Sequence, residues 1–309
     1  MPTDSDRPGA SGRREPQRAE QCEKRVSLAH ERPLHGARDL LCDVPFLSIP
    51  LPPMADYDAP IGALLFDMDG VLVDVSRSYR RAIEETVGHF TGRQVVPGTV
   101  QRYKNEGGFN NDWRLTHAII TDTSMEVPFA RVKEEFQQRY RGADWDGFIA
   151  EEPALASDRV LERLADAVPL MGIVTGRPKA EARWTLKRFG WKEHFPLLVP
   201  HEKHEGRGKP NPFPIQHALS ILGAAGRPTE PDEAVYVGDT VDDMEAARAA
   251  GVWAVGMTPP YVDHDDHASL LNERGAHVVI DDLDELPELL ASFDRRVGAY
   301  AEAAARRAA

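Results

Sequence analysis

Short apolar runs alternate with helical patterns along most of the chain after residue 60. The run 61–66 (IGALLF) is closed by DMDG, which is typical of a buried strand followed by a tight loop. Similar runs recur at 170–175, 197–200, 234–239, 251–257 and 276–280, with helical spacing at 157–167, 179–189 and 241–250. This alternation predicts an α/β fold in which helices cover both faces of a parallel sheet, with ligands at the carboxyl ends of the strands.

The segment 76–150 breaks the alternation. It holds long helical patterns, such as 76–90 and 129–140, and no strand-like run. Because it is inserted directly after the first strand, we expect it to form a helical cap over the strand ends. The segments 56–75 and 151–309 would then form the Rossmann-like catalytic core. The Ala- and Arg-rich end, 291–309, is predicted to be a surface helix.

Residues 1–55 differ from the rest of the chain. They are rich in Arg, Glu, Pro and Ser and have no sustained period of 2 or 3.6, which predicts a disordered extension. Met54, just before the first strand, offers an alternative start. The first thirty residues hold no apolar block typical of a signal peptide, and no run has the ~18 apolar residues of a membrane span. We therefore expect a cytoplasmic protein that does not bind membranes.

The composition narrows the choice of partners. The 309 residues carry a net charge of −13, which argues against a nucleic-acid-binding surface. A small anionic substrate remains compatible with this charge, because a local cation or bound metal ion can offset it. The two cysteines, Cys22 and Cys42, do not make a disulfide framework. The oligomeric state is left open.

Chemically suggestive residues follow four of the predicted strands. They are Asp67 and Asp69 in DMDGVL, Thr175 in GIVTGRP, Lys209 in GRGKPNP, and Asp239, Asp242 and Asp243 in GDTVDD. In a parallel sheet the strand ends point the same way, so these segments meet at one edge although they lie far apart in the sequence.

The grouped carboxylates predict a metal ion. Two carboxylates 4 Å apart repel each other by roughly 4 kcal/mol at an effective dielectric constant near 20, and they also repel a phosphate. A divalent cation relieves this repulsion, and carboxylate oxygens are the ligands that Mg²⁺ prefers. Lys209 adds a positive charge and Thr175 a hydroxyl donor, which can hold phosphoryl oxygens.

These four motifs, in this order, resemble those of the haloacid dehalogenase superfamily, and the helical insertion resembles the C1 cap of one of its subfamilies. The resemblance implies that Asp67 is the nucleophile that becomes an aspartyl-phosphate, and that Asp69 is the general acid and base. It implies phosphate binding by Thr175, Gly176 and Lys209. The implied Mg²⁺ ligands are Asp67, the backbone carbonyl of Asp69, Asp239 and Asp243, with Asp242 as the alternative to Asp243.

The resemblance also bears on the reaction. Dehalogenases of the superfamily lack the second aspartate and need no metal, whereas this chain has Asp69 and the acidic GDTVDD motif. We therefore predict a phosphatase, a phosphoric monoester hydrolase acting on a small phosphorylated metabolite. A phosphomutase and a non-hydrolytic binding protein on the same scaffold are the alternatives.

A loop in the predicted cap is the candidate specificity element. Gly108, Asn110, Asn111, Asp112 and Trp113 combine backbone freedom, amides, a carboxylate and an aromatic ring. This mixture suits a sugar, polyol, aminocyclitol or amino-alcohol phosphate, such as histidinol phosphate. The alternative interpretation is a helix start, with Asn110 or Asn111 as the N-cap and Trp113 in the cap core.

Further residues carry weaker signals. Arg177 contacts either the substrate or a surface carboxylate. His201 and His204 are expected in a solvated loop, and the DHDDH cluster 263–267 in an exposed acidic loop.

Overall fold

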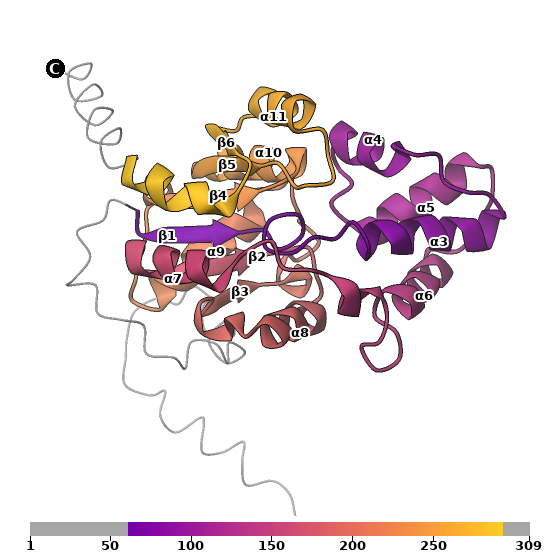
Figure 1. Ribbon diagram of the computed structural model, residues 1–309, viewed down its shortest axis with the longest axis horizontal. Helices are drawn as coiled ribbons and strands as arrows, with labels where there is room; N and C mark the ends of the chain where they lie inside the picture. Colours follow the sequence, from indigo (N-terminus) through magenta and orange to yellow (C-terminus); the bar gives the residue numbers. More distant parts are fainter. Residues whose placement is uncertain (1–60, 293–309) are drawn as a thin grey trace, which may run out of the picture. The chain divides into compact units, whose positions relative to one another are not determined.

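The central feature of the computed structural model, which describes residues 61–292, is a six-stranded parallel sheet in the order β3-β2-β1-β4-β5-β6 (Figure 1). The sheet is continuous, because each strand pairs in parallel with the next in this order. The strands are β1 (Ala63–Phe66), β2 (Met171–Val174), β3 (Leu197–Val199), β4 (Ala234–Gly238), β5 (Trp253–Met257) and β6 (Val278–Ile280). The predicted parallel α/β architecture is therefore confirmed.

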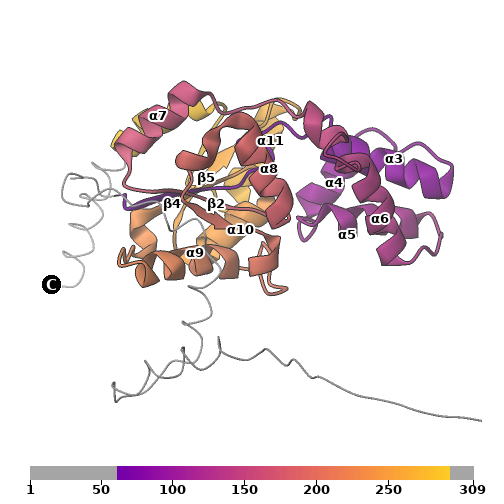
Figure 2. The ribbon, with the colours of Figure 1, turned by 90° about the horizontal axis from the view of Figure 1, so that it is seen from below.

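Helices cover both faces of the sheet (Figure 2). The core helices are α7 (Asp158–Ala167), α8 (Lys179–Phe189), α9 (Phe213–Ala224), α10 (Val241–Ala250) and α11 (His264–Glu273). Leu64 and Phe66 of β1 share one apolar cluster with α7 and α8, whereas Ala63 and Leu65 share the other with α9 and α10. Successive side chains of a strand point to opposite faces, so β1 is buried on both sides.

Four helices are inserted between β1 and α7. They are α3 (Tyr79–Thr91), α4 (Thr99–Glu106), α5 (Asp112–Asp122) and α6 (Phe129–Tyr140). Helix α3 packs against α5 and α6, and the ring of Tyr79 stacks on Tyr140 with centroids 4.0 Å apart. The predicted helical insertion after the first strand is present. The domain limits 76 and 150 stay a prediction, and the predicted extension 1–55 lies outside the described residues.

Short 3₁₀ helices complete the connections: η2 (Phe148–Glu151), η3 (Trp191–Glu193), η4 (His201–Lys203), η5 (Pro231–Glu233) and η6 (Leu283–Glu285). The expectation of an acidic loop at 263–267 is wrong. The side chain of Asp263 caps α11 by accepting from the Asp266 N–H, and the acidic residues that follow form the first turn of the helix.

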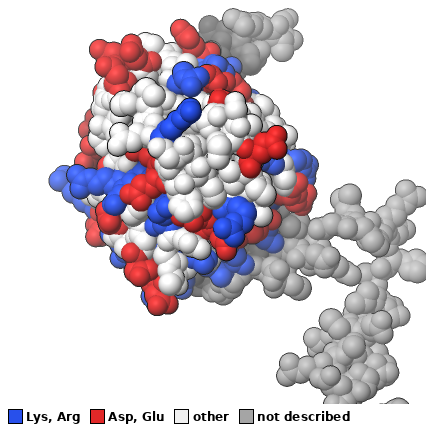
Figure 3. Space-filling model, turned by 90° about the vertical axis from the view of Figure 1, so that its right-hand side faces the viewer, with Lys and Arg blue, Asp and Glu red and all other residues white. Residues whose placement is uncertain are grey.

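One face of the molecule carries charged side chains of both signs. On the face drawn in Figure 3, Lys and Arg side chains are interspersed with Asp and Glu rather than gathered into a basic patch. Within residues 61–292, no helix combines the length and the apolar character that a membrane crossing requires.

Candidate active site

Three carboxylates meet at the carboxyl ends of the two central strands. Asp67 follows β1, Asp239 follows β4, and Asp243 lies in the first turn of α10. One oxygen of each lies within 4.8 Å of the other two. Strands β1 and β4 are direct neighbours, which explains how residues more than 170 positions apart come together.

Two glycines allow this close approach. A Cβ atom on Gly70, whose φ is +74°, would lie 2.1 Å from Asp239 Oδ2. A Cβ atom on Gly238 would lie 2.3 Å from the Cβ of Asp243. Both distances are far below van der Waals contact, so the sequence needs glycine at these two positions to bring the carboxylates together.

Lys209 lies among the carboxylates. Its side chain is fully buried, and Nζ lies 3.1 Å from Asp67 Oδ2 and 2.5 Å from Asp243 Oδ1. Nζ also donates to the hydroxyl of Tyr236 at 2.8 Å. Burial lowers the pKa of Lys209, but the carboxylates of Asp243 and Asp67 more than reverse this effect and raise it above its usual value. The lysine is therefore a fixed cation at neutral pH.

The carboxylates still exceed the available positive charge. Burial raises the pKa of Asp67 to about 7, with Asp243 and Asp69 adding to the rise and Lys209 opposing it. Burial also raises the pKa of Asp239 well above its usual value, and the charges of Asp243 and Asp67 add smaller rises. Asp67 Oδ1 is buried and has no hydrogen-bond partner within residues 61–292. An unpaired carboxylate oxygen beside two more carboxylates fits a hard divalent cation.

The neighbouring strand β2 contributes Thr175 and Gly176. Thr175 is buried, its N–H donates to Val199 O at 3.0 Å, and its Oγ1 accepts the Arg177 N–H at 3.1 Å. Gly176 lies against the cap, because a Cβ atom there would lie 3.0 Å from Asn110 Oδ1. Thr175 and Gly176 thus lie at the same edge of the sheet as Asp67, and their phosphate-binding role stays a prediction.

Asp69 is held by a residue whose role the sequence left open. Arg177 Nε donates to Asp69 Oδ1 at 2.6 Å, and the arginine side chain is fully buried. The surface-carboxylate interpretation of Arg177 is therefore wrong, since its partners are buried or partly buried. His204 also differs from expectation: only 2% of it is exposed, so it does not lie in a solvated loop.

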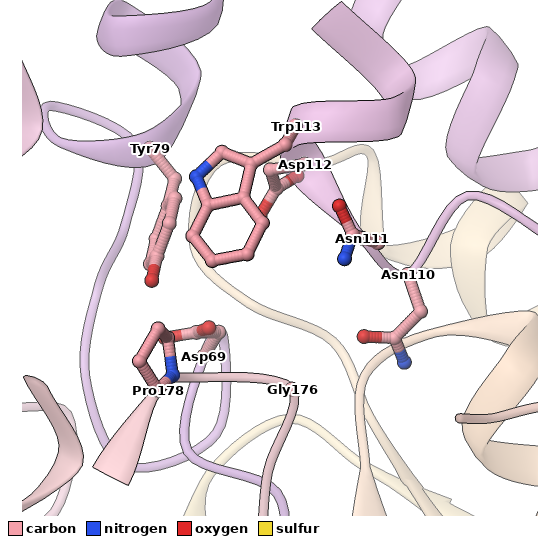
Figure 4. A pocket seen from close by; sticks show the side chains of 8 residues that line it. All are labelled: Asp69, Tyr79, Asn110, Asn111, Asp112, Trp113, Gly176 and Pro178. Carbon is pink, nitrogen blue, oxygen red and sulfur yellow. The ribbon is translucent and has the colours of Figure 1, made fainter. Parts of the chain in front are cut away.

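The cap loop lines a pocket together with the core (Figure 4). Its side chains Asn110, Asn111, Asp112 and Trp113 and the ring of Tyr79 lie opposite Asp69, Gly176 and Pro178. Asn111 also caps α5 by accepting the Arg114 N–H at 3.0 Å, and Trp113 is 8% exposed within the apolar core. Asn111 therefore caps the helix and Trp113 packs in the cap core, as the alternative interpretation predicts, and both also line the pocket.

The remaining cap residues divide by their contacts. Asn110 Nδ2 is buried and has no hydrogen-bond partner in the described part of the chain. Asp112 pairs with Lys104 at 2.9 Å. Burial raises the pKa of Asp112, and Lys104 opposes this rise. The pocket beside Asp67 is therefore lined by polar and charged groups.

The two adjacent aspartates of GDTVDD have different partners. Asp243 joins the carboxylate group and caps α10, where its Oδ2 accepts the Thr240 N–H at 3.0 Å. Asp242 is 2% exposed and turns to the cap, where its carboxylate accepts the N–H groups of Gly108 and Asn110 at 2.7 and 3.1 Å. Of the two candidates, Asp243 is therefore the one placed to bind a metal ion.

Sequence reasoning missed several pocket residues. They are Tyr79 and Arg80 on α3, Lys104 on α4, and Tyr261. Tyr79 and Arg80 fit the amphipathic pattern of α3, so nothing in the sequence distinguishes them from ordinary helix residues. Tyr261 follows a Pro-Pro pair, which predicts an ordinary loop.

A parallel α/β sheet carries these carboxylates and a buried lysine at its strand ends, and comparisons with known proteins identify the class to which this arrangement belongs. Residues 64–257 match the model of the family described as haloacid dehalogenase-like hydrolase. The chain belongs to this family.

Individual relatives support the same assignment. An imidazoleglycerol-phosphate dehydratase of Phytophthora nicotianae is 38% identical over 208 residues, which are 65% of this chain but only 44% of that protein. An N-acetylmuramic acid 6-phosphate phosphatase of Pseudomonas aeruginosa is 27% identical over 74% of this chain and 94% of its own length. The structure of a predicted phosphoglycolate phosphatase from Haemophilus somnus has a TM-score of 0.60 at 19% identity, covering 75% of this chain and 99% of that chain. The family match and the phosphatase relatives confirm the predicted family and enzyme class, a phosphatase of that family, and the solved structure agrees with the fold.

Proposed function

We propose that the chain is a Mg²⁺-dependent phosphatase that hydrolyses the phosphomonoester of a small metabolite through an aspartyl-phosphate on Asp67. The observation that carries this proposal is the position of Asp67: one oxygen pairs with Lys209 and the other is unpaired beside Asp239 and Asp243. In this proposal residues 76–150 form the cap that selects the substrate.

The proposed reaction has two steps. In the first, an Asp67 oxygen attacks phosphorus, the bond from phosphorus to the ester oxygen breaks, and Asp69 donates a proton to that oxygen. In the second, Asp69 takes a proton from a water molecule, whose oxygen attacks the same phosphorus and releases phosphate and free Asp67. Asp69 is suited to both steps because it lines the pocket and follows Asp67 by two residues.

Other residues of the chain hold the phosphoryl group and the cation. Lys209, the hydroxyl of Thr175 and the backbone of Gly176 would bind phosphoryl oxygens. Asp67, the backbone carbonyl of Asp69, Asp239 and Asp243 would hold Mg²⁺. The bound ion would neutralise charge on the carboxylates and the phosphoryl group.

The cap loop supports a polar leaving group. The free amide of Asn110 can bond a hydroxyl or carbonyl oxygen, and the Asp112 carboxylate can accept from a hydroxyl or an amine. Sugar, polyol, aminocyclitol and amino-alcohol phosphates, histidinol phosphate among them, have these groups. The names of the relatives in Phytophthora and Pseudomonas likewise describe an imidazole-bearing and an amino-sugar phosphate.

A substrate screen tests the proposal. The purified full chain with Mg²⁺ would be assayed for phosphate release against a panel of phosphomonoesters, with and without excess chelator. We expect at least one polar metabolite phosphate to be hydrolysed in a chelator-sensitive way. Full activity in excess chelator would contradict the proposal. Conversion of a sugar phosphate to its isomer with almost no phosphate release would indicate a phosphomutase instead.

A further inference from the structure

The guanidinium of Arg177 is enclosed beside Asp69. Its Nε and Nη2 lie 2.6 and 2.5 Å from Asp69 Oδ1, and its Nη1 donates to Thr185 Oγ1 of α8 at 2.9 Å. The stacked rings of Tyr79 and Tyr140 lie on one side of it, with centroids 5.2 and 6.0 Å from Cζ. A planar group bonded through all three of its nitrogens and packed beside two rings has a fixed orientation.

The same Nη2 of Arg177 also contacts Glu152. Nη2 lies 3.0 Å from Glu152 Oε2, and neither side chain is exposed to solvent. Burial raises the pKa of Glu152, and the charge of Arg177 opposes this rise. The arginine thus joins two carboxylates, one in the candidate active site and one outside it.

Glu152 lies where the chain returns from the inserted helices to the core, directly after η2. Its Oε1 accepts the hydroxyl of Ser78 at 2.6 Å and that of Tyr140 at 3.1 Å. Ser78 precedes α3, where the chain enters the inserted helices, and Tyr140 ends α6. Both crossings between core and cap therefore meet at the carboxylate that holds Arg177.

Both contacts of Arg177 with Asp69 use Oδ1, while Asp69 lines the pocket and its side chain is 24% exposed. A carboxylate fixed through one oxygen presents the other in a defined direction. Asp69 Oδ2 is therefore the oxygen available to exchange a proton in the pocket.

We propose that Arg177, held by Glu152, is a positioning residue that orients Asp69 for proton transfer and makes this orientation depend on the two chain crossings into the cap. The inference rests on the proposed function, in which Asp69 donates a proton to the departing oxygen. It differs from a purely structural role, because loss of Arg177 would affect most the substrates whose leaving group needs that proton.

Two probes of similar size separate these roles. The p-nitrophenolate of p-nitrophenyl phosphate departs readily as an anion, whereas the leaving group of phenyl phosphate depends more on a proton. The value of kcat/KM for each reports phosphoryl transfer to Asp67 and not the later hydrolysis. Wild type, Arg177→Lys, Glu152→Gln and Asp69→Asn would be compared. Arg163→Lys is the control for the Arg-to-Lys exchange, since Arg163 pairs with Asp284 at the surface of the described residues.

For Arg177→Lys we expect kcat/KM to fall about tenfold or more further with phenyl phosphate than with p-nitrophenyl phosphate, within the range of general acid catalysis. Glu152→Gln keeps the arginine, so kcat/KM should fall less, but again further with phenyl phosphate than with p-nitrophenyl phosphate. This second variant preserves the test if Arg177→Lys folds poorly. Arg163→Lys should change neither value.

Each outcome has one meaning. If Asp69→Asn lowers kcat/KM more with phenyl phosphate, while Arg177→Lys and Glu152→Gln lower it equally with both probes, the positioning role is overturned. If Asp69→Asn itself lowers kcat/KM equally with both probes, the proposed acid role of Asp69 fails instead. A larger loss with phenyl phosphate in all three variants supports the inference.

Discussion

The carboxylate of Asp242 accepts the backbone N–H of Gly108 at 2.7 Å, so the first turn of core helix α10 holds the cap loop directly. The second carboxylate oxygen takes the N–H of Asn110 at 3.1 Å. The preceding residue, Gly107, has a φ of +85°, and a Cβ atom there would lie 3.3 Å from Asp242 Oδ1, so this position favours glycine. The loop that carries the proposed specificity residues is thereby fixed to the core.

Exchange of Asp242 should loosen this loop. In Asp242→Asn one acceptor oxygen becomes an NH₂ group facing a backbone N–H. The unmet donor costs about 1–3 kcal/mol, which corresponds to roughly a 5- to 150-fold rise in KM if the loop contacts substrate. Steady-state kinetics on the best substrate of the panel would measure KM, and kcat should change less. Glu245→Gln is the matched control. Glu245 lies on the same helix and pairs with Arg274 through partly exposed side chains, so its exchange should leave KM unchanged.

The proposed nucleophile, Asp67, should be essential for activity. Asp67→Asn should lower kcat by roughly 10³-fold or more, because the amide cannot form the aspartyl-phosphate. The variant should stay folded, since the exchange is nearly isosteric and Lys209 keeps Asp243 as its partner. Phosphate release and circular dichroism would be measured side by side. Activity close to wild type would remove Asp67 from its proposed role.

Metal binding can be tested without an activity assay. If the carboxylates hold Mg²⁺, addition of the ion should raise Tm, because a ligand that binds only the folded state stabilises it by RT ln(1 + [L]/Kd). Asp239→Asn should lose most of this rise, whereas Asp265→Asn, an exposed acid in the first turn of α11, should keep it. An equal Mg²⁺ effect in both variants would place the ion elsewhere.

His204 predicts how stability depends on pH. Burial lowers the pKa of His204 from 6.5 to about 3, with the charges of Lys209 and His201 acting in the same direction. The unfolded chain therefore binds a proton that the folded chain does not, and stability falls as pH falls below 6.5. By pH 5 this group should remove about 2 kcal/mol of the free energy of unfolding.

Denaturant unfolding at pH 7.5 and pH 5 would measure this loss. In His204→Gln the loss between the two pH values should be smaller by about the same 2 kcal/mol. The control is His89→Gln, which replaces a half-exposed histidine on α3 and should leave the wild-type pH dependence in place. If His204→Gln keeps the full wild-type loss, the histidine is not the group that titrates.

The sequence predicted those parts of the molecule that local pattern determines. The runs before Asp67, Thr175 and Asp239 identified the strands, and the rule that parallel strand ends meet at one edge was enough to group the carboxylates. Helix α11 was missed because its first turn is almost entirely His and Asp, so the capping role of Asp263 looked like a charged loop.

Tertiary pairing explains the rest of what was missed. Arg177 and Asp69 are 108 positions apart, and Asp242 and Gly108 are 134 positions apart. No spacing rule links such residues, and each belongs to a motif with a different obvious interpretation. Only the fold shows that Arg177 serves Asp69 and that Asp242 turns away from its neighbour Asp243.

The place of β1 in the sheet has one more consequence. Asp67 extends from a strand that is flanked by β2 and β4 and buried on both faces, so its backbone belongs to the part of the described chain least able to open by itself. Amide hydrogens of β1 should therefore exchange with solvent only when the whole core unfolds. The groups that would react with phosphorus would then stay assembled through every smaller fluctuation of the helices above them.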